Sequence, residues 1–336
     1  MTFILGAVIL IALIFDYTNG FHDAANAVAT SISTRAIPPN IALAGAAVLN
    51  VVGALISTSV ATTLAKGIID PSAVTLPVIL GGLLGAIVWN LLTWWWALPN
   101  SSSHCLIGGV VGAVIATNGT GPVKWAAISE KVLIPTVMAP LIGFAVGIVI
   151  MLALMWIFHR AQPGLLNRRF RLAQTVSASI VAFSHGSNDA QKTMGIITLA
   201  LFTGKIIPSL EVPTWVKFAS AITIGAGTYT GGKKIIRTLG MRLVKLTPVQ
   251  GFAAETSASA VLLSTAHMGF PVSTTHVITA SIMGVGATQR LSAVKWGLSF
   301  NIFIAWIITL PAAGLVGAIC ARIAVALTRT DLVWIK

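Results

Sequence analysis

Long hydrophobic runs follow one another along almost the whole chain, and short polar segments interrupt them. The apolar runs lie near residues 2–15, 41–65, 76–97, 105–117, 132–158, 173–183, 194–204, 214–230, 249–267, 277–288 and 296–325. A helix that crosses a bilayer needs about 20 predominantly apolar residues, and several of these runs reach that length. The pattern therefore predicts an all-α polytopic membrane protein with about 10 helical segments.

The composition agrees with this fold class. Of the 336 residues, 56% are hydrophobic and only 9% are charged, and the mean hydropathy is +0.92. A soluble domain carries about 25% charged residues, so no soluble domain of any size is expected. The net charge of +13 comes from basic residues between the apolar runs, where they set membrane topology. We therefore expect the lipid bilayer as a partner and no nucleic acid.

Four polar segments stand beside apolar runs that are too short to span a membrane. They are TNGFHDAANA (residues 18–27), PNSSSH (99–104), SHGSNDAQK (184–192) and PVSTTH (271–276). Polar backbone at membrane depth is tolerated only where it is buried in protein or lines a cavity. The sequence therefore predicts broken helices or re-entrant hairpins at all four places.

The four segments form an internal repeat. An aspartate segment precedes a hydroxyl segment in each half: 78 residues separate Asp23 from Ser101, and 84 separate Asp189 from Ser273. We therefore divide the chain into a first repeat (1–160), a linker (161–172) and a second repeat (173–336). Repeats with breaks at matching positions are typical of secondary transporters, whose sites lie at those breaks.

Basic residues predict the orientation of the repeats. One cluster lies in and beside the linker and another lies at residues 233–245, and both are expected in the cytoplasm. If residues 76–117 and 248–288 each form a re-entrant hairpin, each half crosses the membrane three times. An odd number of crossings makes the two repeats inverted, with the N-terminus outside and the linker cytoplasmic.

The hydroxyl segments have the features of an anion site. Proline breaks a helix, Ser or Thr caps the next one, and the free N–H groups of that new helix attract an anion. The candidate ligands are Ser101, Ser102, Ser103, Ser273, Thr274 and Thr275. The alternative is that they only cap and pack helices, but duplication at matching positions favours an oxyanion site near the midplane. His104 and His276, one turn further on, are candidates for supporting this site or for packing, and both roles stay open.

Carboxylates within apolar surroundings are the candidate cation ligands. A charge at the centre of a membrane helix costs about 2.5–3.5 kcal/mol, so it faces a cavity or a partner. The candidates for cation coupling are Asp23, Asn26, Asn188, Asp189 and Glu255, and the first four would hold Na⁺ if Na⁺ is the ion. Lys192 lies one turn after Asp189, so an internal ion pair is the alternative role there. No cofactor is expected, and the coupling ion is H⁺ or Na⁺.

These residues resemble the inorganic phosphate transporter (Pit) family. GFHDAANAVAT and HGSNDAQKTMG look like its paired signatures, LPNSSSH and FPVSTTH look like its substrate motifs, and LTPVQGFAAE also matches. The resemblance implies symport of inorganic phosphate with a cation across the inner (plasma) membrane, two inverted repeats, and phosphate held by the hydroxyl segments. It also implies that Asp23 and Asp189 serve cation coupling.

Two positions depart from the family pattern. His22 stands where the signature usually has Asn, and Asn50 stands where many members carry Glu. Asn50 is similar to the bacterial proton-coupled branch of the family, which favours protons over sodium as the coupling ion.

Two other functions compete with phosphate symport. A sulfate permease is one, because a site of helix N-termini accepts any tetrahedral oxyanion. An intramembrane hydrolase is the other, since Ser, His and Asp are all present. Catalysis needs a single nucleophile with its base, whereas here both halves carry the same set, so we do not expect an enzyme. The sequence leaves open a homodimer and the choice between free phosphate and a neutral metal–phosphate complex.

Overall fold

The computed structural model describes residues 2–330, and the regular elements in this range are helices without any strand. The first half contains α1 (Thr2–Ser33), α2 (Pro39–Ala54), α3 (Ser59–Gly67), α4 (Leu76–Trp95), α5 (Ser102–Asn118), α6 (Trp125–Ile128) and α7 (Ile134–Ile157). The second half contains α8 (Pro163–Thr203), α9 (Thr214–Thr230), α10 (Lys233–Arg237), α11 (Pro248–His267), α12 (Thr274–Ala287) and α13 (Trp296–Thr330). The predicted all-α fold class is confirmed.

Local signals explain where many of these helices begin and end. Pro39, Pro163 and Pro248 occupy the first turn of α2, α8 and α11, where a missing N–H costs nothing. After α5 and α9 the chain reverses at Gly119 and Gly231, which take positive φ angles of 76° and 68°. Glycine adopts this conformation without a steric penalty, so it ends these helices sharply.

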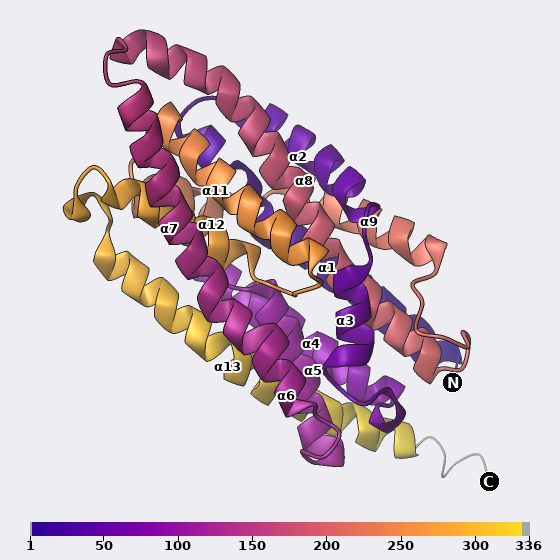
Figure 1. Ribbon diagram of the computed structural model, residues 1–336. Helices are drawn as coiled ribbons and strands as arrows, with labels where there is room; N and C mark the ends of the chain where they lie inside the picture. Colours follow the sequence, from indigo (N-terminus) through magenta and orange to yellow (C-terminus); the bar gives the residue numbers. More distant parts are fainter. Residues whose placement is uncertain (1, 331–336) are drawn as a thin grey trace.

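Two long helices, α1 and α8, run antiparallel through the middle of the bundle (Figure 1). Gly204, after the end of α8, lies against Leu5 near the start of α1, and Thr34, after the end of α1, donates a hydrogen bond to Gln174 near the start of α8. Glycines allow their neighbours to approach closely. Gly20 of α1 packs against the backbone of α9, and Gly186 of α8 packs against the backbone of α2. The polar faces of α1 and α8 are therefore enclosed by other helices.

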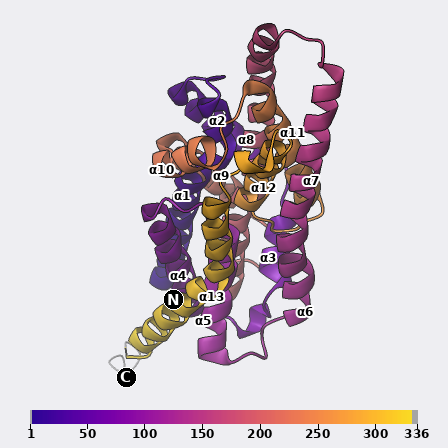
Figure 2. The ribbon, with the colours of Figure 1, turned by 90° about the vertical axis from the view of Figure 1, so that its left-hand side faces the viewer.

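Helices α7 and α13 form part of the outer surface of the bundle (Figures 1 and 2). Large apolar side chains such as Val149, Trp156, Ile307 and Leu315 are exposed on them. Among the described residues, four helices are long and apolar enough to cross a membrane, or five if α2 and α3, bent by 64°, count as one span. An apolar surface of this extent is suited to contact with lipid.

The predicted breaks at the two hydroxyl segments are confirmed. Helix α4 ends at Trp95 before α5 begins at Ser102, and α11 ends at His267 before α12 begins at Thr274. The paired arms cover 76–118 and 248–287, close to the expected hairpins at 76–117 and 248–288. Their re-entrant path in a bilayer, and the inversion of the repeats, stay predictions.

The predicted breaks at the two aspartate segments are wrong. Helix α1 continues through Asp23, and α8 continues through Asp189, without interruption. The physical reason is that polar side chains of these segments find partners on neighbouring helices, so the backbone keeps its own hydrogen bonds. Helix α8 also begins at Pro163, so most of the expected linker at 161–172 is helical.

The contact of α8 with α2 gives a test of this packing. A methyl group added by Gly186→Ala collides with the backbone of Asn50, whereas the one added by Gly45→Ala on α2 meets nothing within 4 Å. Overpacking of this kind costs about 1–3 kcal/mol. We expect Gly186→Ala to lower the melting temperature of the detergent-purified protein, and Gly45→Ala to leave it unchanged or raise it. Equal melting temperatures of the two variants would contradict the close α2–α8 contact.

Candidate functional site

The hydroxyl segments cap two helices in the same way. The Ser101 hydroxyl accepts a hydrogen bond from the backbone N–H of His104, at 3.2 Å, and the Ser273 hydroxyl accepts one from the backbone N–H of His276, also at 3.2 Å. Pro99 and Pro271 precede these caps and stop the chain from entering the helix earlier. Both halves therefore present a capped helix N-terminus at the predicted position.

The two helix N-termini lie next to each other. The Ser103 hydroxyl of α5 donates to the carbonyl of Val272, just before α12, at 3.1 Å. The six hydroxyl-bearing residues, which we call the hydroxyl cluster, are all buried: Ser101, Ser102, Ser103, Ser273, Thr274 and Thr275. Because each N-terminus carries partial positive charge, two of them side by side could hold an anion, and we call this arrangement the anion cradle.

Helix α1 joins the two halves of the hydroxyl cluster. The Asp23 carboxylate accepts hydrogen bonds from the hydroxyls of Ser102, at 2.9 Å, and Thr275, at 3.3 Å. The Asn26 amide donates to the hydroxyls of Thr274, at 3.1 Å, and Thr275, at 2.9 Å. A spacing of three residues puts Asp23 and Asn26 on one face of the helix. The structure therefore brings these two candidates together with the anion cradle.

A second carboxylate faces the first from α8. One coordinating atom from each of Asp23, Asp189 and His185 lies within 4.8 Å of the others. Lys192 Nζ lies 2.7 Å from Asp189 Oδ1, and His185 Nε2 lies 3.4 Å from Asp189 Oδ2. The alternative ion pair of Asp189 with Lys192 is therefore present. We call Asp23 and Asp189 the aspartate pair; it could hold a cation between α1 and α8.

Asn188 and Glu255 do not join the aspartate pair. Asn188 is buried, but within residues 2–330 its side-chain amide has no hydrogen-bond partner. Glu255 of α11 accepts hydrogen bonds from the hydroxyls of Thr30 and Ser177, and from the Gln174 amide at 2.9 Å. Thr30 follows Asp23 by seven residues, which is about 10 Å along the helix. Glu255 therefore belongs to a separate polar cluster.

His104 and His276 pack behind the helix N-termini. Their ring centroids lie 4.9 Å apart, and His276 stacks on Trp306 at 3.8 Å. A ring nitrogen of His104 forms a hydrogen bond with the Thr136 hydroxyl at 2.7 Å, and the Trp306 indole N–H donates to the carbonyl of Pro99 at 3.1 Å. These contacts hold the starts of α5 and α12 together.

Several residues of the site were not among the candidate ligands predicted from the sequence. His185 lies four residues before Asp189, so helical spacing alone could have assigned it to the same face. His22 adjoins Asp23, and its ring nitrogen lies 2.9 Å from the carboxylate. Gln174 and Ser177 carry no such signal, because their partner Glu255 lies on another helix about 80 residues away.

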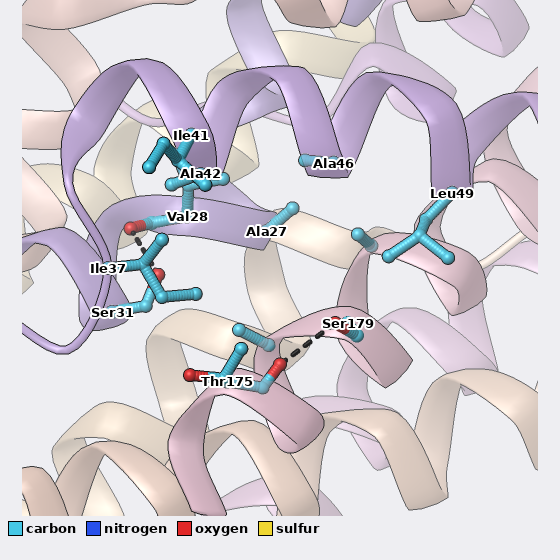
Figure 3. Close-up of a pocket in the computed structure, with 13 residues that line it drawn as sticks. Ala27, Val28, Ser31, Ile37, Ile41, Ala42, Ala46, Leu49, Thr175 and Ser179 are labelled. Atoms are coloured by element: carbon cyan, nitrogen blue, oxygen red, sulfur yellow. Dashed lines mark hydrogen bonds between the residues drawn. The ribbon is translucent and has the colours of Figure 1, made fainter. Parts of the chain in front are cut away.

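A small cavity between α1, α2 and α8 is separate from this site (Figure 3). Its lining is mostly small and apolar. The Ser31 hydroxyl donates to the carbonyl of Val28 at 3.1 Å, and the Ser179 hydroxyl donates to the carbonyl of Thr175 at 2.8 Å. No residue of the hydroxyl cluster lines it. The anion cradle is instead enclosed in the protein.

Comparison with known proteins agrees with this arrangement. Residues 19–317 match the model of the phosphate transporter family. Probable low-affinity inorganic phosphate transporters of Mycobacterium tuberculosis (strain ATCC 25618 / H37Rv), Rhizobium meliloti and Bacillus subtilis are 49%, 47% and 44% identical to this chain. These matches cover 94%, 94% and 93% of this chain, and 76%, 95% and 94% of the respective relatives.

A solved structure described as the sodium-dependent phosphate transporter has the same fold. It superposes with a TM-score of 0.88 at 24% sequence identity, and covers 96% of this chain and 99% of its own. At this identity the match is evidence for the fold alone. The family match, the relatives and the apolar helices together exclude the hydrolase alternative and lead to one assignment. The chain is an integral membrane transport protein and belongs to the phosphate transporter family.

Proposed function

We propose that this protein is a secondary symporter that carries inorganic phosphate together with a cation, and that the cation is H⁺. The observation that carries the proposal is the meeting of two capped helix N-termini, one from each half, against Asp23. Two matching sets of hydrogen-bond donors at one buried place are better explained by binding of a small tetrahedral anion than by helix packing alone.

Phosphate would be held by the hydroxyl cluster and by the backbone N–H groups of α5 and α12. In the enclosed structure, Ser102 and Thr275 donate their hydroxyls to Asp23. Phosphate oxygens would accept these donors instead. The hydrogen bonds described around the hydroxyl cluster involve no arginine or lysine. Neutral donors hold an anion less tightly than a buried ion pair does, which suits a site that must also release it.

The aspartate pair gives a physical reason for coupling. Asp23 and Asp189 carry two negative charges, and Lys192 balances one of them. Phosphate would add further negative charge to a buried site, where repulsion between like charges is strong. A cation bound at the pair removes this repulsion, so cation and phosphate each strengthen the binding of the other. Transport of the two together follows from this reciprocity.

The groups around the aspartate pair favour a proton over Na⁺. Ring nitrogens of His22 and His185 lie next to the two carboxylates, and the Lys192 amine contacts Asp189. Nitrogen bases bind protons, whereas hard metal cations prefer oxygen ligands. Na⁺ at Asp23, Asn26, Asn188 and Asp189 is the competing arrangement. Glu255, enclosed by hydroxyl and amide donors, would serve as a further coupling carboxylate on the far side of Asp23.

The carboxylates would also separate phosphate from sulfate. Near neutral pH, phosphate keeps at least one O–H group, which can donate to Asp23, whereas sulfate has no proton to donate. Sulfate would therefore leave a buried carboxylate facing an anion. Unmatched polar groups of this kind give discrimination of about 10⁴-fold or more.

The test of the proposed function is uptake of labelled phosphate by the purified protein in proteoliposomes. We expect an inward proton gradient without Na⁺ to drive uptake, and excess sulfate to compete poorly. The Asp23→Asn variant should lose the stimulation of uptake by the proton gradient. It should also lose the preference for phosphate over sulfate, because an amide can donate to either anion. Uptake driven only by a sodium gradient would replace H⁺ by Na⁺ in the proposal. Sulfate uptake at the phosphate rate would remove the phosphate assignment.

A second prediction concerns the caps of the cradle. Replacing Ser101 and Ser273 together with Ala should weaken phosphate binding at equilibrium, because a hydrogen bond to a charged group contributes about 1.5–3 kcal/mol. For two such bonds, a loss of about 100-fold or more in affinity is expected. The matched control is the pair Ser179→Ala and Ser264→Ala, whose hydroxyls only donate to carbonyls of their own helices. Normal phosphate affinity in the first double variant would rule out the cradle.

We also propose that the repeats are inverted in the plasma membrane, with the N-terminus outside and the 161–172 linker in the cytoplasm. After Cys105 and Cys320 are replaced by Ala, Leu165→Cys should react with an impermeant thiol reagent only from the cytoplasm. Phe3→Cys should react only from outside. Both positions are exposed, whereas the control Val78→Cys is buried and should stay unlabelled. Labelling of positions 3 and 165 from the same side would contradict the inversion.

A further inference from the structure

Asp16 is a buried carboxylate that the proposed site does not use. It lies on α1, is fully buried, and within residues 2–330 neither of its carboxylate oxygens has a hydrogen-bond partner. It precedes Asp23 by seven residues, or about 10 Å along the helix. Asp16 is therefore on the same face as the aspartate pair but too far away to share its ligands.

The surroundings of Asp16 contain polar groups that are also unsatisfied. Thr193 of α8 lies close enough to act on the Asp16 carboxylate as a hydroxyl donor, although the pair falls outside hydrogen-bond geometry, and Asn19 lies one turn further along α1. Both residues are fully buried, and neither the Thr193 hydroxyl nor the Asn19 amide has a partner that meets hydrogen-bond geometry in the described chain. The three side chains thus form a polar cluster with unused donors and acceptors.

Within residues 2–330, no unpaired positive charge acts on Asp16. The charged groups that act on it are Asp189 and Lys192 of α8, and Lys192 is already paired with Asp189. Helices α2 and α4, which also pack against α1, contain no titratable residue. Helices α10, α11 and α12 and residues 238–243 also contact α1, and their titratable residues are Lys233, Lys234, Arg237, Arg242, Glu255, His267 and His276. Gly232 and Gly240 of this part of the chain pack on α1 at Phe21 and Ala29, and none of these titratable residues is among the charges that act on Asp16. Helix α9 contains only Lys217 and Tyr229, and neither is buried. An ionised Asp16 would therefore be an unpaired charge in an apolar interior, which is strongly unfavourable.

A proton fits this cluster better than a metal ion. The side chains offer the two carboxylate oxygens of Asp16, the Thr193 hydroxyl and the Asn19 carbonyl oxygen, whereas hard cations take about six or more oxygen ligands. The backbone carbonyls nearby are engaged within the continuous helices α1 and α8. A proton needs only one oxygen of Asp16, and the resulting O–H group can donate to Thr193 or Asn19.

The position of Asp16 along α1 gives this proton a role. Asp16, Asp23 and Thr30, the last bonded to Glu255, follow one another at intervals of seven residues. Because α8 runs antiparallel, Thr193, Asp189 and Ser177 lie opposite them in reverse order. Three acidic sites, namely Asp16, the aspartate pair and Glu255 of α11, therefore follow one another along α1, and the anion cradle lies at the middle one.

We propose that Asp16, with Thr193 and Asn19, is a proton-loading site on the N-terminal side of the phosphate cradle. This inference rests on the proposed function as a proton-coupled symporter. A hydronium ion transfers a proton to the Asp16 carboxylate, which forms an O–H bond and leaves a water molecule. That O–H bond breaks when the proton is passed on, and a carboxylate of the aspartate pair, Asp23 or Asp189, forms the new O–H bond. Asp16 then returns to its ionised form and can be loaded again.

The experiment compares two activities of the protein in proteoliposomes. Uptake driven by a proton gradient requires loading, whereas exchange of labelled for unlabelled phosphate at equal pH on both sides requires no net proton movement. We expect Asp16→Asn to lower gradient-driven uptake by about tenfold or more, and to change exchange far less. Asp16→Glu should restore gradient-driven uptake with a shifted pH profile. The control is Ser220→Ala, a buried and neutral position without a hydrogen-bond partner in the described residues, which should retain both activities.

Two transport results would overturn the inference. One is gradient-driven uptake by Asp16→Asn at the wild-type rate. The other is equal loss of uptake and exchange without rescue by Asp16→Glu, which would make Asp16 a structural residue. Infrared spectra recorded across a pH titration supply a readout that does not depend on transport. A protonated-carboxyl C=O band should appear in the wild type and be missing in Asp16→Asn. If the band differs in this way but the wild type takes up no phosphate, the proton site stands and the proposed function is rejected. If the spectra of the wild type and Asp16→Asn are identical, the proton site is rejected.

Discussion

The need to satisfy two carboxylates away from water organises the centre of this molecule. Asp23 and Asp189 face each other across α1 and α8, and each must find donors from protein groups alone. Asp23 obtains them from the starts of α5 and α12, and Asp189 obtains them from Lys192 and His185 on its own helix. The same contacts bring the breaks of both halves to one place. The hydrogen bonds that satisfy the carboxylates therefore also hold the cradle together.

Close helix packing makes this arrangement possible. Gly20 and Gly186 occupy equivalent positions, three residues before Asp23 and Asp189, and each lets a neighbouring helix approach the backbone. A larger side chain there would push α9 or α2 outward and open the polar interface. Small residues therefore act together with the aspartates, because a buried charge is tolerable only where the surrounding groups fit closely enough to reach it.

The repeat is symmetric at the cradle and asymmetric on either side of it. Superposing Asp23 on Asp189 places Asp16 on Ala182, and Asn50 stands where many family members carry a second Glu, so Asp16 and Glu255 have no acidic counterpart in the other half. Within the proposed mechanism, duplication supplies the matched donors that surround phosphate. The unmatched carboxylates, Asp16 and Glu255, then give the proton a different environment on each side of the same site.

The sequence by itself determined the all-helical membrane fold, the two breaks and the residues that cap them, because runs of apolar residues, prolines and hydroxyls act on their immediate neighbours. Local signals also placed Asp23, Asn26 and Asp189 on polar helix faces. They failed at the aspartate segments, which were expected to break and are continuous helices. Only the tertiary structure decided that Ser102 and Thr275 meet at Asp23 and that Glu255 is bound by Thr30 and Gln174. It also decided that, within residues 2–330, no group meets hydrogen-bond geometry with the Asp16 carboxylate. These contacts join different helices, many of them far apart in the chain, and no local pattern encodes which side chains a folded bundle will bring within hydrogen-bonding distance.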